Sequence, residues 1–412
     1  MTCPPSPEIA DQVPAGERQI CVRVVADDEG FDRLESDWRR LQDATSVSAF
    51  KSFDWQRNWW RHFGGAERGC VLHLVVVEVV GVVVGIAPLM IRSEPVLGPV
   101  RLETLQFLAS GISDYLGILC ETRHAPTVAA AIAGHLRDVS FDVLVLRDLR
   151  DLSGVSELLL DRLGQARWTV QRQPGETCPH TPLSATWDDT LKQFSASHRK
   201  RLSYMQRRLE REFEVEFQRI ADPAELDDAM RTMMSMHQQH WVGTGFAGAF
   251  NSADSQRFHL ETARAFLARG GLVLAFLRIN GKVAASLYGF KAGRSLQFYL
   301  SGRSETDEFV KYSPGVVIHV YCMQAMIQEG IGDYDFLRGT EPYKYTLGAT
   351  DSTTWSLLAF RPGAWYGRWK HGLGVRKGQL VEDMKALRRS IRQRLSGPET
   401  RQPADRASVE GE

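Results

Sequence analysis

Apolar segments between residues 272 and 301 predict three β-strands in succession. Residues 272–279 and 282–290 are rich in apolar and β-branched side chains, and Asn280-Gly281 lies between them. Asn-Gly tolerates the positive φ angles of a type I′ turn, so the two segments predict a β-hairpin. A second turn at residues 292–294 leads into a third strand at residues 295–301. The pattern therefore predicts an antiparallel meander.

The segment that follows changes to helical periodicity. Ser313 is a favourable N-cap residue and Pro314 suits the first turn of a helix. Apolar side chains then recur at helical spacing, at Val316, Val320, Met323 and Ile327. Gly330 is expected to end this helix, and residues 334–337 predict a short buried strand. This order places a helix N-terminus at the mouth of a sheet, where backbone N–H groups can bind an anion.

Residues 71–91 are apolar except for His73 and Glu78, and are numerous enough to span a bilayer. The segment also contains a GxxxG spacing between Gly81 and Gly85. Valine is its commonest residue, however, and this β-branched composition favours two buried strands with a turn near residues 80–81. We therefore expect no transmembrane segment.

The remaining pattern divides the chain into two α/β units. The first unit is expected to contain a helix, aromatic-rich helical turns, the valine hairpin, a strand and a second helix, at residues 31–42, 54–63, 71–91, 102–108 and 125–137. Residues 171–181, with Pro174, Gly175 and Pro179 and with Pro182 just beyond, are the expected boundary. The predicted division is a disordered leader (1–19), a first domain (20–172), a second domain (173–372), and a basic helix with a disordered tail (373–412).

Composition excludes a global bias towards polyanions. The 412 residues carry 50 Lys plus Arg and 50 Asp plus Glu. Neither nucleic acid nor an anionic membrane is therefore an expected general partner. The six cysteines form no CxxC pair, and the first 18 residues lack the pattern of a signal peptide. These features favour reduced thiols and a cytoplasmic protein.

Three motifs have simpler structural interpretations. The GxGxxG pattern at residues 243–248 follows a predicted helix rather than a strand, which argues against a dinucleotide site. The basic cluster at residues 199–211 is followed at once by glutamates and fits a solvated helix face. His237 and His240 have no nearby third ligand, so no metal site is expected.

Several segments resemble the GNAT N-acetyltransferase superfamily, in particular its cellulose-biosynthesis-associated (CelD/BcsL-like) branch. The resemblance is most specific in the second half, in the meander and in residues 311–315, 335–339 and 341–344. It extends to residues 38–41, 50–59, 113–115, 198–209 and 237–250. It implies an α/β (α+β) fold of two GNAT-like units, each with a mixed, mostly antiparallel sheet flanked by helices. FemABX-type transferases are related to this group.

The resemblance also implies transfer of an acyl group from acyl-CoA to an amine, with acetyl-CoA as the expected donor. The helix that begins near Ser313 would bind the pyrophosphate, and a tyrosine after the next strand would protonate the leaving sulfur. Carried over to this sequence, the donor-binding residues are Lys311, Ser313, Gly315, Val316 and Val317. The general acid is Tyr343, with Tyr345 as the second choice. Most GNAT enzymes have Arg/Gln-x-x-Gly-x-Gly/Ala at this loop, whereas this chain has Lys-Tyr-Ser-Pro-Gly.

The sequence leaves the general base and the acceptor site open. Glu341, His237 and Asp114 are the candidate bases. Residues expected to contact the substrate are Asp114, Tyr115, Trp241, Arg338 and Lys344. Arg338 and Lys344 could instead form ion pairs with Asp335 or Glu341.

The expected acceptor is a small-molecule amine or an amino sugar linked to envelope or exopolysaccharide biosynthesis. No permanently bound cofactor is expected, because acyl-CoA is a co-substrate. Two alternatives stay open at this point: a FemABX-like enzyme that uses aminoacyl-tRNA as donor, and a catalytically silent GNAT-like scaffold that binds protein partners.

Overall fold

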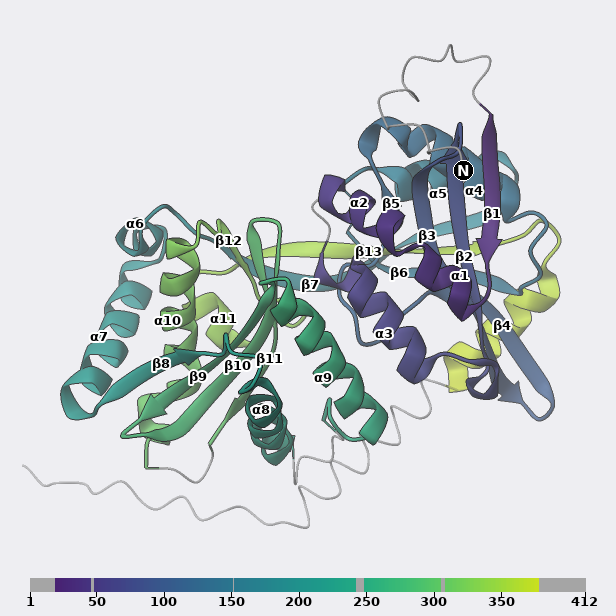
Figure 1. Ribbon diagram of the computed structural model, residues 1–412. Helices are drawn as coiled ribbons and strands as arrows, with labels where there is room; N and C mark the ends of the chain where they lie inside the picture. Colours follow the sequence, from purple (N-terminus) through teal and green to yellow (C-terminus); the bar gives the residue numbers. More distant parts are fainter. Residues whose placement is uncertain (1–18, 46–47, 151, 242–247, 305–307, 378–412) are drawn as a thin grey trace, which may run out of the picture.

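A computed structural model describes residues 19–45, 48–150, 152–241, 248–304 and 308–377 (Figure 1). The strands are β1 (Ile20–Val25), β2 (Cys70–Val79), β3 (Val82–Leu97), β4 (Val100–Phe107), β5 (Leu119–Cys120), β6 (Val143–Leu149), β7 (Thr169–Pro182), β8 (Val215–Arg219), β9 (Leu272–Ile279), β10 (Lys282–Ala292), β11 (Ser295–Arg303), β12 (Asp333–Asp335) and β13 (Thr350–Phe360). The α-helices are α1 (Asp28–Arg33), α2 (Glu35–Thr45), α3 (Phe53–Phe63), α4 (Ala125–His135), α5 (Val155–Gln165), α6 (Trp187–Lys192), α7 (Ala196–Glu212), α8 (Leu226–Trp241), α9 (Ala253–Ala268), α10 (Pro314–Gln328) and α11 (Pro342–Thr346).

All thirteen described strands belong to one sheet. Its order is β1-β2-β3-β4-β6-β13-β7-β12-β11-β10-β9-β8, and β5 pairs with β3 beside this path. Strand pairs are antiparallel except β4 with β6 and β11 with β12. Helices flank the sheet in both units: α10 packs on β9, β10 and β11, while α4 packs on β1 and β2. The predicted α/β class, with two units of mostly antiparallel sheet flanked by helices, is confirmed.

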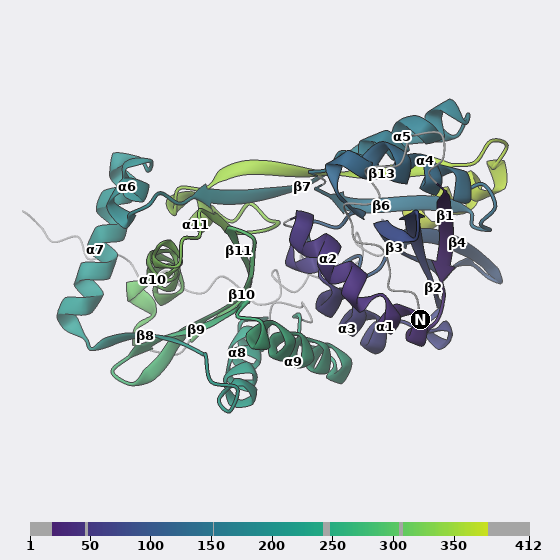
Figure 2. The ribbon, with the colours of Figure 1, turned by 45° about the horizontal axis from the view of Figure 1, so that its top comes forward.

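Two long strands connect the units (Figure 2). β7 pairs with β13 along most of its length, and then with β12 of the second unit. β13 pairs on its other side with β6 of the first unit. Residues 171–181, expected as a boundary between domains, are therefore a strand of the shared sheet. The boundary was inferred from local proline and glycine content. Local composition does not show which strands pair with this segment on either side.

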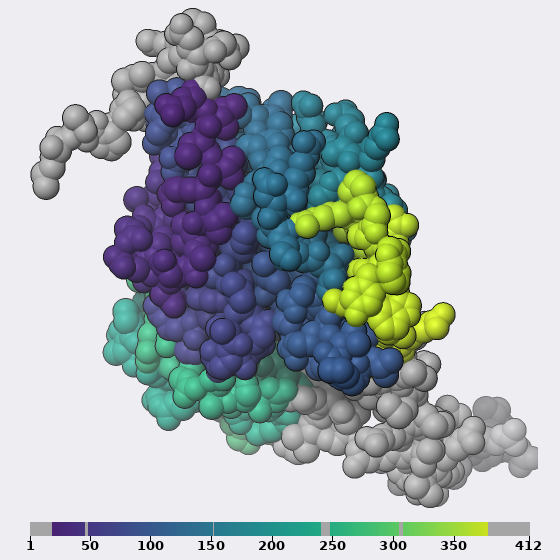
Figure 3. Space-filling view, turned by 90° about the vertical axis from the view of Figure 1, so that its right-hand side faces the viewer, coloured from purple at the N-terminus to yellow at the C-terminus, as the bar shows by residue number. Residues whose placement is uncertain are grey.

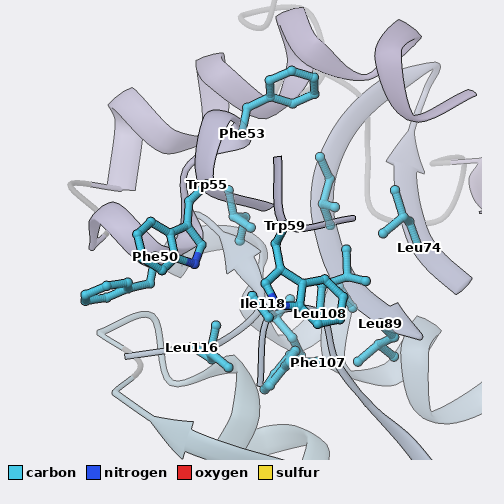
Figure 4. Close-up of a cluster of buried hydrophobic side chains, with 14 of the residues drawn as sticks. Phe50, Phe53, Trp55, Trp59, Leu74, Leu89, Phe107, Leu108, Leu116 and Ile118 are labelled. Carbon is cyan, nitrogen blue, oxygen red and sulfur yellow. The ribbon is translucent and has the colours of Figure 1, made fainter. Parts of the chain in front are cut away.

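The valine-rich segment forms two buried strands, as predicted. β2 and β3 pair around Val80 and Gly81, which adopt φ angles of 52° and 74°. No helix among the described residues combines the length and the apolar character needed to cross a bilayer. The aromatic side chains of α3 pack over this part of the sheet (Figure 4). Phe50 and Trp55 extend this core to Tyr299 of β11. These ring contacts join the two units.

The other predicted elements are present with shifted boundaries. The helix expected at residues 31–42 is divided at Leu34 into α1 and α2. The meander forms β9, β10 and β11, and Asn280 and Gly281 have the positive φ angles of 49° and 75° that the turn requires. The chain then returns from β13 to a helix at residues 365–377 that lies on the first unit (Figure 3). The basic segment expected further on lies outside the described residues.

Candidate active site

A cavity of about 290 Å³ lies where β11 ends and α10 begins. β11 pairs with β12 only from Ser295 to Gln297. Beyond β12 the chain turns to β7 instead, where the Phe336 amide donates to the Pro179 carbonyl oxygen at 2.9 Å. The two parallel strands therefore separate towards their C-terminal ends. The last residues of β11, the first turn of α10, and two aromatic residues described below line the cavity.

The first turn of α10 differs from the expected anion cradle. Ser313 adopts a left-handed conformation (φ 54°, ψ 52°), and its side chain makes no capping hydrogen bond. The Val316 and Val317 amides both donate to the Ser313 carbonyl oxygen, at 2.9 and 3.2 Å. Because Pro314 has no N–H, Gly315 supplies the one amide of this turn without a backbone acceptor in the described chain. Val316 and Val317, expected among the donor-binding residues, therefore offer no free amide, because the sequence does not show their bonds to Ser313.

A cation at this cavity was missed in the sequence. Arg303, the last residue of β11, lines the cavity, and its Cδ would lie 3.8 Å from a Cβ added at Gly315. The meander pattern places the end of β11 next to the start of the helix, and this pattern could have indicated Arg303 in the sequence. Lys311, the expected cation, lies instead over the ring of Tyr312, with its ammonium 5.2 Å from the ring centre. Lys311 is not among the residues that line the cavity.

Tyr343 and His319 complete the lining. The Tyr343 ring lies nearly parallel to the His319 ring, with ring centres 5.5 Å apart. Burial raises the pKa of Tyr343, and the charge of Glu341 raises it further. The phenol therefore keeps its proton at neutral pH. Its hydroxyl has no hydrogen-bond partner within the part of the chain that the structure describes.

Glu341 and Lys344 form a structural pair on either side of Tyr343. Glu341 is exposed and accepts from the Lys344 ammonium at 2.8 Å. The same ammonium donates to the carbonyl oxygens of Arg338 and Gly339, at 2.9 and 3.0 Å. A lysine ammonium has three donors, so none is left for a substrate. Lys344 thus fixes the turn before α11, and Glu341 does not line the cavity.

Asp114 and Arg338 meet across the two units. The Arg338 guanidinium donates to the Asp114 carboxylate and to the Ser113 carbonyl oxygen. Arg338 therefore pairs with neither Asp335 nor Glu341, the two partners that the sequence suggested. Burial raises the pKa of Asp114 to about 6, although the Arg338 charge lowers it. Of the three candidate bases, Asp114 is the one with its carboxyl buried at the junction of the units.

Tyr115 borders a second cavity, of about 520 Å³, between the units. Its hydroxyl donates to Asp335 Oδ1 at 2.8 Å, and the Arg150 guanidinium lies 4.4 Å from its ring centre. Lys51 lines the cavity from the first unit and Gln297 from β11. The expected site residues are thus divided: Tyr115, expected to contact the substrate, faces this larger cavity, and Tyr343, the expected acid, faces the smaller one.

His237 and Trp241 belong to α8. The His237 Nδ1 lies 2.8 Å from the Ser301 carbonyl oxygen, and its ring packs edge-on against Phe250. His237 therefore holds α8 against β11, beside the cavity rather than in its lining. Trp241 ends α8, and its side chain lies outside the described residues, as does most of the GxGxxG pattern. Within the described ranges, no three His, Cys, Asp or Glu side chains form a metal-binding group.

One family comparison covers the smaller cavity. Residues 196–345 match the family model described as "Acetyltransferase (GNAT) domain". This GNAT-matched segment contains the meander, α10 and Tyr343, and it begins after Asp114 and Tyr115. No curated protein matches the sequence.

The solved structure of FemX has a similar fold over most of the chain. The chain is similar to FemX, with a TM-score of 0.57 and 12% identity, over 84% of this chain and 98% of that chain. It is also similar to the C-terminal domain (DUF2156) of a putative lysylphosphatidylglycerol synthetase from Agrobacterium fabrum (TM-score 0.48, 13% identity, 83% of this chain and 94% of that chain). A tandem GNAT protein from the clavulanic acid biosynthesis pathway is a further match (TM-score 0.39, 11% identity, 83% and 98%). At these identities the likeness to FemX concerns the fold, and the CelD/BcsL-like branch stays a prediction.

Proposed function

We propose that the protein is an N-acyltransferase that binds an acyl thioester, in the first instance acetyl-CoA, in the cavity between β11 and α10. The proposed acceptor is the amine of a small molecule or amino sugar, as in envelope or exopolysaccharide biosynthesis. One observation carries the proposal: the Tyr343 hydroxyl, which has no hydrogen-bond partner among the described residues, shares this cavity with the Gly315 amide and Arg303. These groups supply an acid for a leaving thiolate, and an N–H and a cation for a phosphate.

In the proposed reaction the amine nitrogen attacks the acyl carbon and the carbonyl electron pair moves to oxygen. Collapse of this intermediate breaks the C–S bond, and the thiolate takes the proton of the Tyr343 hydroxyl. The amine loses one proton to solvent, and the tyrosinate is reprotonated from solvent. The raised pKa of Tyr343 means that the tyrosine enters each cycle protonated, and it also makes the phenol a weaker acid than an exposed tyrosine.

Calorimetric titration with acetyl-CoA tests the donor site. Gly315→Glu would place a carboxylate next to Arg303 and the bound phosphate, so it is expected to weaken binding strongly. Gly315→Ala is the matched control, because its Cβ would meet only Arg303 Cδ, at an ordinary contact distance of 3.8 Å. A folded Gly315→Glu variant with wild-type affinity would refute this donor site.

Tyr343→Phe tests the acid. Removing the phenol should lower turnover by about a hundredfold to ten-thousandfold while donor affinity changes little. The measurement is release of CoA thiol with a panel of amine acceptors that includes glucosamine. A stable variant with near-wild-type turnover contradicts the role, and a variant that only loses stability assigns Tyr343 to packing.

The thin amide cradle favours one second candidate, an aminoacyl-tRNA donor. Pro314 and the two amide bonds to Ser313 leave one amide of this turn without a backbone acceptor among the described residues, which is a weak site for a pyrophosphate. Mass spectrometry of ligands retained by the purified protein distinguishes the two donors. Retained CoA supports the proposal, retained tRNA supports the second candidate, and retention of neither, with no acetyl-CoA binding, supports the scaffold alternative.

A further inference from the structure

His319 is a buried imidazole that none of the expected roles includes. It lies on the second turn of α10, and 1% of its surface is exposed. Phe298 and Phe336 enclose the ring, with ring centres 4.6 and 5.6 Å away, and Tyr343 stacks on it. Although enclosed on these sides, the ring lines the donor cavity. Its orientation is therefore fixed by packing, and one edge is left to the cavity.

A hydrogen-bond chain determines which ring nitrogen carries the proton. The Tyr334 hydroxyl lies 2.7 Å from His319 Nδ1, and the Cys322 sulfur also lies near it. A tyrosine hydroxyl has one proton to donate, and an imidazole nitrogen is a far better acceptor than sulfur. Tyr334 therefore donates to Nδ1.

The remaining nitrogen, Nε2, is then the protonated one. Nδ1 is occupied as an acceptor, and a neutral imidazole has one N–H. Burial lowers the pKa of His319 to about 3, and the charge of Lys344 contributes to the same direction. The ring is therefore neutral at physiological pH. In the described chain Nε2 has no hydrogen-bond partner, so its N–H is available to a ligand in the cavity.

We propose that His319 is a neutral hydrogen-bond donor that stabilises the oxyanion formed at the acyl carbon. Its hydrogen bond with Tyr334 directs the other ring nitrogen into the cavity between β11 and α10. This inference rests on the proposed function and names the oxyanion-binding residue of that site. Attack at the carbonyl carbon moves the π electron pair to oxygen, and the Nε2–H donates to this oxyanion without transferring its proton. When the C–S bond breaks, the pair returns to the carbonyl and Tyr343 protonates the thiolate. A neutral imidazole suits this role because its N–H can donate a hydrogen bond to the oxyanion while the proton stays on the ring.

The first test reads the tautomer directly in the full chain. Long-range ¹H–¹⁵N spectra of ¹⁵N-histidine-labelled protein, assigned with His319→Gln, should show protonated Nε2 and unprotonated Nδ1 from about pH 5 to about pH 9. Tyr334→Phe removes the donor to Nδ1 and should mix the two tautomers. A proton on Nδ1 in the wild type, or a charged ring in this pH range, overturns the inference without any assay of activity.

The second test measures the effect on the reaction, with water in place of the unidentified amine. Slow hydrolysis of acetyl-CoA passes through the same oxyanion and releases a free thiol. His319→Phe keeps a ring against Tyr343 but has no N–H, so the rate should fall about a hundredfold to a thousandfold with acetyl-CoA affinity retained. His319→Gln, which keeps an N–H donor, should retain more of the rate, and Tyr334→Phe should lower it less than His319→Phe does.

The two failures are distinguishable. A wild-type protein that does not bind acetyl-CoA refutes the CoA form of the proposed function. A His319→Phe variant that binds acetyl-CoA and hydrolyses it at the wild-type rate overturns the oxyanion role of His319 and leaves the proposed function standing. If His319→Phe does not fold, the rates of His319→Gln and Tyr334→Phe decide, because a wild-type rate in Tyr334→Phe overturns the role of the hydrogen-bond chain.

Discussion

Replacing Asp114 with asparagine is expected to change how the free energy of unfolding depends on pH. Asp114 is 6% exposed, and burial raises the pKa of its carboxyl from 3.8 to about 6 in the folded protein. The folded state therefore binds this proton more tightly than the unfolded chain does. Ionisation of Asp114 destabilises the fold as the pH rises from about 4 to about 6. The difference between the two pKa values corresponds to roughly 3 kcal/mol.

The assay is urea unfolding of the wild type and Asp114→Asn at a series of pH values from about 4 to about 8. Other titrating groups are common to both proteins and cancel in the difference. Relative to the wild type, the asparagine variant should gain roughly 3 kcal/mol between the two ends of this range. Arg338→Met, which removes the cation that lowers the pKa of Asp114, should extend the transition to higher pH.

A difference between the two proteins that does not vary with pH would refute this reasoning. A difference of the opposite sign would have a specific meaning. It would show that the ion pair with Arg338 outweighs the cost of burying Asp114, and that the pKa of this carboxyl is lowered rather than raised.

Three further substitutions test the contact between the units, the turn between β9 and β10, and the turn before α11. Trp55 is fully buried, donates to Ser113 Oγ at 2.8 Å and contacts rings of the second unit. Trp55→Ala should therefore lower the free energy of unfolding in urea by about 3 to 5 kcal/mol. A loss below about 1 kcal/mol would show that the units are stable without this contact. Gly281→Ala should cost about 1 kcal/mol by the same assay, because the residue has φ 75° but no neighbour within 4 Å of an added Cβ; an unchanged midpoint would contradict the strain argument. Lys344→Met leaves two carbonyl oxygens without their donor, so thermal unfolding should reveal a loss of about 1 to 3 kcal/mol, and an unchanged Tm would show that water replaces the ammonium.

Local pattern was sufficient for elements whose determinants are close in sequence. Asn280-Gly281 specifies its turn through φ angles, and the valines of β2 and β3 specify buried strands through their branching. The pairing of β13 between β6 and β7 was not predictable in this way. It depends on residues that are far apart in the chain, and the same alternation of residues allows many partners.

The candidate site was predictable in part for the same reason. The positions of Gly315, Val316 and Tyr343 along the chain were sufficient to bring them to one cavity. Their hydrogen bonds could not be predicted, because they depend on the left-handed conformation of Ser313. A serine in the sequence does not indicate this conformation. His319 appeared in the sequence as one polar residue in an apolar helix. Its environment comes from Tyr334 and Phe298, which lie on other elements.

The position of β13 has a consequence for the order of folding during synthesis. The ribosome makes β6 and β7 well before residues 350–360, which fill the place between them. Until then both strands present unpaired N–H and C=O groups, and a nascent chain in this state is prone to pair with other chains. A fragment that stops at residue 345, where the GNAT match ends, would keep both edges open permanently. We expect such a fragment to aggregate, and the full chain to need its last strand before either unit is protected.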